Sequence, residues 1–227
     1  MIERLRLSMS DRRFAVLALL VALSVLVAAL VAFRIVYTQS ADHTGLLWNL
    51  VLAWVPLGLA LLVYDRAEHG RRRGAALAAA MWLLFFPNAP YIVTDFVHLR
   101  GSEGRAYWFD LVLIATVATT GLLLGFVSLY LVHVVVRRAA GPAVGWAFVV
   151  VALALSSLGV YLGRVWRWNS WDALVNPWSV VRRLAHAFAN PDPRAVAFML
   201  AFTLFLAATY AAFYVVARVD ERADRRG

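Results

Sequence analysis

One segment of the chain brings together residue types that can do chemistry. Asp95 and His98 are three residues apart, and on an α-helix they would share a face with Tyr91 and Thr94. A carboxylate and an imidazole at this spacing can act as acid and base, bind a metal ion or form a hydrogen-bonded pair. We therefore take Asp95 and His98 as candidate catalytic residues, and Asn88 and Tyr91 as candidate substrate-binding residues.

A second segment combines cationic and amide side chains with three tryptophans. Arg164 and Arg167 can hold an anionic group such as a lipid phosphate, because a guanidinium binds phosphate through two parallel hydrogen bonds. Asn169 and Asp172 complete the candidate substrate-binding residues. These last two also match a helix-capping pattern, and tryptophans are typical of a membrane–water interface, so a purely structural interpretation stays open.

Six apolar segments must position these residues. Apolar residues make up 63% of the 227-residue chain and charged residues only 15%, which is unlike a soluble domain. A membrane-spanning helix needs roughly 20 apolar residues. The sequence predicts an all-α polytopic transmembrane bundle, a single integral membrane domain, with spans at about 14–33, 46–64, 75–97, 110–136, 143–163 and 195–217.

The third predicted span is interrupted by Pro87 and Pro90, each of which removes a backbone donor and opens the helix. The freed carbonyls need partners from the protein or from a water-filled cavity, and Asn88 can supply one. The uninterrupted apolar run stops at Phe86. The segment therefore either crosses the membrane as a broken helix or re-enters, and the sequence leaves both open.

The arginines indicate the orientation. With six spans, fourteen of the 22 basic residues fall on the side that carries both termini and eight on the other. Because short arginine-rich connections stay in the cytoplasm, we expect a protein of the cell membrane with both termini in the cytoplasm. The first apolar segment is longer than the apolar core of a signal peptide, so we expect it to stay uncleaved. Both chemistry-bearing segments then lie on the outer side with Asp110, where Asp95 can pair with Arg164 or Arg167.

The connection at 164–194 is the longest. Asn176 can cap a helix that has Pro177 at its first position, and the apolar residues after it recur at helical spacing. This pattern predicts an amphipathic helix in the outer interface at about 177–189, although a plain connector stays open.

Two glycine pairs, Gly121 with Gly125 and Gly159 with Gly163, have the small-xxx-small spacing that lets helices approach closely in lipid. We expect them to pack inside the bundle rather than to form a dimer interface.

Other features exclude some functions. The absence of cysteine excludes thiolate metal sites and cysteine nucleophiles, and the absence of lysine excludes Schiff-base chemistry. The net charge of +9 comes from arginines in short connections, so we expect no nucleic-acid partner. A metal site that combined Asp95, His98, Asp110 or Asp172 is under-determined, so we assign no metal ligand and identify no cofactor.

The other histidines receive no role. We expect His43 and His69 to be solvated in connections, and His133 lies near the cytoplasmic end of the fourth span beside Arg137.

The strings FFPNAPYIVTDFVHL and GRVWRWNSWD resemble the two signatures of an uncharacterised family of bacterial membrane proteins, classed as a domain of unknown function. The resemblance covers the chain from about the second span to the sixth. It implies a multi-spanning protein of a bacterial inner membrane and no established activity, so no functional residue is carried over from it.

Three hypotheses follow. In the structural one, Asn88 mends the proline break, Asp95 pairs with an arginine and the tryptophans anchor the interface. In the second, the outer polar residues bind or act on a lipid or an anionic headgroup, with Asp95 and His98 as acid and base if the protein is an enzyme. In the third, the chain is a small transporter or a membrane subunit of a larger assembly, with a homo-oligomer or a membrane partner.

Overall fold

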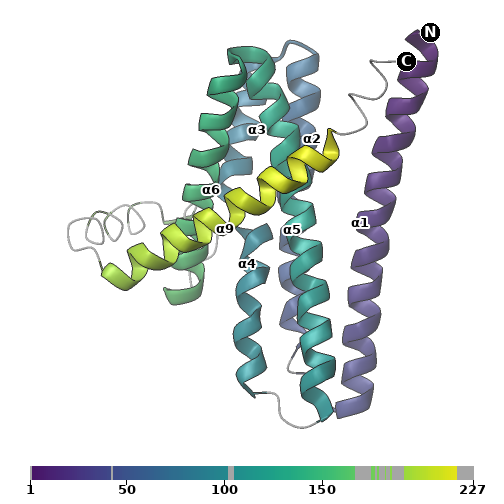
Figure 1. Cartoon of the computed structure of the whole chain (residues 1–227), viewed down its shortest axis with the longest axis vertical. Coiled ribbons are helices and arrows are strands. Elements are labelled where there is room, and N and C mark those ends of the chain that lie inside the picture. Colours follow the sequence, from purple (N-terminus) through teal and green to yellow (C-terminus); the bar gives the residue numbers. More distant parts are fainter. Residues whose placement is uncertain are drawn as a thin grey trace.

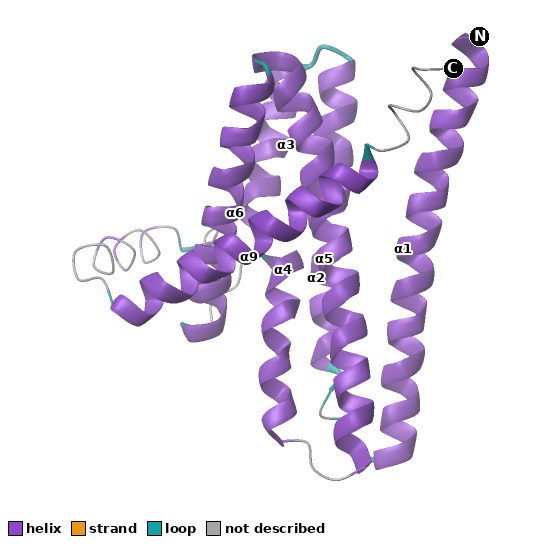
Figure 2. Ribbon diagram, in the orientation of Figure 1, coloured by secondary structure: helices purple, strands orange, loops and turns teal. Residues whose placement is uncertain are grey.

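The fold is all-α, as predicted. The computed structural model describes residues 2–41, 43–101, 105–166, 175, 176, 178, 182, 185 and 192–218, and no strand occurs among them (Figure 2). The helices are α1 (Ile2–Thr38), α2 (Gly45–Glu68), α3 (Arg72–Phe85), α4 (Asn88–Tyr91), the 3₁₀ helix η1 (Ile92–Gly101), α5 (Arg105–Ala140), α6 (Pro142–Val165) and α9 (Pro193–Ala217).

Six helical segments are long and apolar enough to cross a membrane. They cover Arg13–Thr38, Gly45–Glu68, Arg72–Val97, Tyr107–Ala140, Pro142–Val165 and Pro193–Ala217. The third consists of α3, α4 and part of η1, which follow one another from one end of the bundle to the other (Figure 1). Of the two alternatives for this segment, the structure favours the broken helix, because the segment runs from the α2–α3 turn at one end of the bundle to the η1–α5 connection at the other without turning back.

Local sequence signals set the helix boundaries. Gly141, with a φ of 90°, stops α5, and Pro142 at the first position starts α6. The side chain of Asp192 caps α9 by accepting a hydrogen bond from the N–H of Arg194 at 2.9 Å. Gly70, with a φ of 69°, turns the chain between α2 and α3.

The start of α1 and the α2–α3 and α5–α6 turns lie at one end of the bundle, which we call the proximal end (Figure 1). We call the end with the α1–α2 and η1–α5 connections the distal end. The α6 helix ends well before α1, α5 and η1 reach the distal end, and α9 crosses the bundle obliquely. The last residues of α6 therefore lie beside the middle of the broken third span rather than at its tip.

Two clusters of buried apolar side chains form the core. One is built around Trp82, Phe86 and Tyr210, and the other contains Leu57 and Ile92. Residues of the proline-broken segment belong to both clusters, so the break lies in the packed interior of the bundle.

Candidate functional site

The break in the third span is closed by an exchange of hydrogen bonds. Pro90 lacks the N–H that would bond the carbonyl of Phe86 in a regular helix. The N–H of Ala89 donates to that carbonyl instead, at 3.2 Å, which deprives the carbonyl of Phe85 of its usual donor. The side-chain Nδ2 of Asn88 donates to Phe85 at 3.0 Å. Asn88, a candidate substrate-binding residue, thus also repairs the backbone, as the structural hypothesis states.

Glycines on two helices make room for this break. A Cβ atom at Gly159 of α6 would lie 2.6 Å from Cγ of Pro87, and one at Gly121 of α5 would lie 2.9 Å from the carbonyl oxygen of Ala89. A Cβ at Gly125 would lie 3.0 Å from Cβ of Ala89. Gly121, Gly125 and Gly159 therefore pack inside the bundle, with the broken segment held between α5 and α6.

Arg164, in the last turn of α6, is the centre of the polar contacts beyond the break. Its Nε and Nη2 atoms donate to Oγ1 of Thr94 at 2.9 and 2.5 Å, and Nη2 also donates to Oδ1 of Asp95 at 2.6 Å. Its guanidinium carbon lies 4.4 Å from the centre of the Tyr91 ring. Three side chains of one segment therefore fix a single cation.

Asp95 is the buried partner in this set, with a side chain only 1% exposed against 26% for Arg164. Its Oδ2 accepts a hydrogen bond from Nδ2 of Asn49 on α2 at 2.9 Å. A carboxylate in a membrane helix is costly unless it is paired, and Asp95 is neutralised by Arg164. The predicted ion pair between Asp95 and Arg164 is present, and it joins α2, the third span and α6.

The 3₁₀ geometry changes which side chains share a face. With about three residues per turn, Tyr91 and Thr94 lie in one row, and Asp95 lies in the next row. An α-helix would have put all the polar residues of this segment on one face, as the sequence spacing suggested. Arg164 contacts both rows because its guanidinium group donates to Thr94 and Asp95 together.

The other sequence candidates lie outside the part of the chain that the structure describes. Arg167, Asn169 and Asp172 lie outside the described residues, and so does the side chain of His98. The predicted interfacial helix at 177–189 falls almost entirely outside them as well. Among the residues that the structure describes, no group of three histidine, cysteine or acidic side chains could hold a metal ion.

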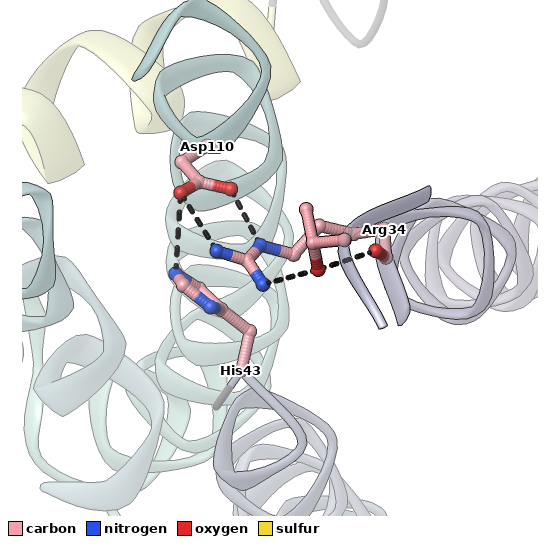
Figure 3. A network of polar contacts seen from close by, with 4 residues as sticks. Arg34, His43 and Asp110 are labelled. Atoms are coloured by element: carbon pink, nitrogen blue, oxygen red, sulfur yellow. Dashed lines mark hydrogen bonds and ion pairs between the residues drawn. The ribbon is translucent and has the colours of Figure 1, made fainter. Parts of the chain in front are cut away.

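The sequence did not predict a second polar centre, which lies near the distal end (Figure 3). Nε and Nη2 of Arg34 donate to the two carboxylate oxygens of Asp110 at 2.7 and 3.1 Å, and Nη1 donates to Oγ1 of Thr38 at 2.9 Å. Nε2 of His43 lies 3.8 Å from Oδ2 of Asp110. These side chains tie α1 and its connection to α5.

Two expectations are corrected by this centre. His43 was expected to be solvated, but it is only 8% exposed because it packs beside Asp110. Arg34 was counted with the connection after the first span, yet α1 continues to Thr38 and Arg34 is buried in the helix. The only local signal was the position of Arg34 directly after an apolar run.

A family model described as a protein of unknown function, DUF1361, matches residues 48–209. The match covers well over half of the chain, which therefore belongs to this family. Asp95, Asp110 and Arg164 lie within the match, whereas Arg34 and His43 precede it. No curated protein and no solved structure matches the chain.

Proposed function

We propose that this member of the DUF1361 family binds an anionic headgroup at Arg164, on the outer side of a bacterial inner membrane. The observation that carries the proposal is the incomplete pairing of a fixed guanidinium. An arginine has five N–H donors. Those on Nε and Nη2 bond to Thr94 and Asp95, whereas Nη1 has no partner in the described part of the chain.

The position of Arg164 supports this proposal. Arg13 and Arg138 both donate to the hydroxyl of Tyr64, which marks a polar level near the proximal end. Asn49, which like Arg164 donates to Asp95, lies on α2 before Tyr64. At 1.5 Å per residue, the two positions are about 22 Å apart along the helix axis. The hydrocarbon core is about 30 Å thick. With the proximal end in the cytoplasm, the site lies just inside the outer boundary, where a headgroup reaches it with little displacement.

The local charge favours an anion. The Arg164–Asp95 pair is neutral, but the connection at 164–194 contains five arginines and two aspartates. A guanidinium that is already held needs little further ordering, so a phosphate at Nη1 gains a charge-assisted hydrogen bond at small entropic cost. The ring of Tyr91 is covered by Arg164, which leaves this face unsuited to a quaternary ammonium group.

A site-specific reporter tests the proposal. The chain lacks cysteine, so Val165→Cys, which is 54% exposed beside Arg164, can carry an environment-sensitive fluorophore. Titration with short-chain phosphatidylglycerol in a non-ionic detergent should give a saturable change. Arg164→Gln and Arg164→Lys should weaken it, whereas Arg194→Gln, at an exposed arginine in the first turn of α9, should not. An equal response in all variants would refute binding at Arg164.

Transport is the second candidate function. It is favoured by the hydrogen bond between Asn49 and Asp95, which places a polar pair inside the bundle next to a broken helix. A transporter must expose this pair to each side of the membrane in turn. Cysteine at Asn49 should then react with an impermeant maleimide from either face of a sealed vesicle, and reaction from neither face or from one face alone would count against transport.

A further inference from the structure

A second cationic site lies at the proximal end, where α5 and α9 finish. Nη1 of Arg137 and Nη1 of Arg218 both donate to the hydroxyl oxygen of Tyr214, at 2.8 and 2.7 Å. The two nitrogens therefore lie no more than about 5.5 Å apart, the sum of those two bonds. Two guanidinium groups this close repel each other, and an anion beside Arg137 would reduce this repulsion.

Two side chains of this site, Tyr214 and Arg137, have donors without an acceptor among the described residues. Tyr214 is only 8% exposed and accepts both hydrogen bonds, while its own O–H proton has no acceptor in the described part of the chain. Arg137 contacts no carboxylate among the described residues, and only its Nη1 has a partner there. A buried polar donor without an acceptor is costly, so an oxygen-rich group that accepts from Tyr214 and Arg137 would be stabilising here.

The walls of the site are rigid and aromatic. The imidazole of His133, which is fully buried, stacks on the ring of Tyr214 with centroids 5.2 Å apart, and Trp146 meets the same ring edge-on at 4.9 Å. Nδ1 of His133 is hydrogen-bonded to the hydroxyl of Tyr210 at 3.0 Å. Because these contacts fix Tyr214, the direction of its hydroxyl and of the arginine bonded to it is fixed as well.

We propose that Arg137, Tyr214 and Arg218 form a binding site for a phosphate group at the proximal end of the bundle. A phosphate has several oxygens in a tetrahedral arrangement, so it can accept from both guanidinium groups and from the phenol together. The group can belong to an anionic phospholipid of the adjacent leaflet or to a soluble phosphate compound. This site is separate from Arg164, which lies at the opposite end of α6.

A reporter close to the site tests the assignment. Ala140→Cys, an exposed position at the end of α5, can carry the fluorophore in the otherwise cysteine-free chain. In a non-ionic detergent, short-chain phosphatidylglycerol or inorganic phosphate is titrated at constant ionic strength. Saturation by phosphatidylglycerol alone identifies a lipid source, and saturation by inorganic phosphate identifies a soluble one.

The variants decide whether the binding is specific. Arg137→Gln should weaken binding about tenfold or more, since it removes a charged donor. Tyr214→Phe keeps the ring and should weaken binding in the same direction, which covers the case in which Arg137→Gln fails to fold. Arg138→Gln removes the same charge from the neighbouring arginine, which pairs with Glu68 instead, and should leave binding unchanged. No saturation in the parent chain, or equal binding by the Arg137 and Arg138 variants, would overturn the proposal.

Discussion

Arg34 and Asp110 are 76 residues apart in the sequence, and both are buried in a bidentate ion pair between α1 and α5. Besides this pair, the hydrogen bond from Nε1 of Trp54 to Oγ of Ser24 at 3.0 Å joins α1 to the other helices. Near the distal end, this ion pair therefore adds a polar link to the apolar packing of Val27 and Val31 of α1.

Replacement of either partner of this pair should be strongly destabilising. Arg34→Gln or Asp110→Asn leaves the opposite charge buried without its partner, which typically costs about 3–5 kcal/mol. The double variant should cost less than the sum of the two single changes. A double-mutant cycle of unfolding in detergent measures this coupling, with Arg72→Gln, an exposed arginine at the start of α3, as a control. Additive costs would show that the two side chains do not depend on each other.

The break in the third span gives a prediction in which one substitution rescues another. Asn88→Leu leaves the carbonyl of Phe85 without a donor and should cost about 1–3 kcal/mol. Pro90→Ala restores an N–H at position 90 that can bond Phe86, so the N–H of Ala89 can return to Phe85. In the Pro90→Ala background, Asn88→Leu should therefore cost clearly less. An equal cost in both backgrounds, measured by thermal unfolding, would contradict this account of the break.

Part of this arrangement could be predicted from the sequence and part could not. Apolar runs show the spans directly, and prolines at positions 87 and 90 show the break because their effect is local. Asp95 and Arg164 could be paired because both lie near the ends of spans that finish on the same side. The pair of Arg34 and Asp110 could not be predicted. No local pattern shows that the end of the first span lies beside the start of the fourth. The 3₁₀ geometry after Pro90 was also missed, because the residue spacing fits an α-helix equally well.

The contact between Gly159 and Pro87 predicts a large effect from one methyl group. Gly159→Ala would place a Cβ 2.6 Å from Cγ of Pro87, so α6 must move away from the third span, at a typical cost of about 1–3 kcal/mol. Gly58→Ala on α2 is the matched control, because no atom lies within 4 Å of its Cβ position and alanine favours a helix. The control should be neutral or slightly stabilising in thermal unfolding. Equal effects at the two positions would show that α6 does not depend on this close contact.

The orientation of the bundle remains a prediction, and it decides which leaflet each of the two proposed sites faces. Ala41→Cys reports on the distal end and Glu68→Cys on the proximal end, and the chain has no other cysteine. The arginine distribution predicts that a membrane-impermeant maleimide added to intact cells labels position 41 and not position 68. Labelling of position 68 alone would show that the bundle has the opposite orientation in the membrane. The Arg164 site would then face the cytoplasm and the Arg137–Tyr214 site the outer leaflet, so a soluble cytoplasmic phosphate compound could no longer be the ligand of the second site.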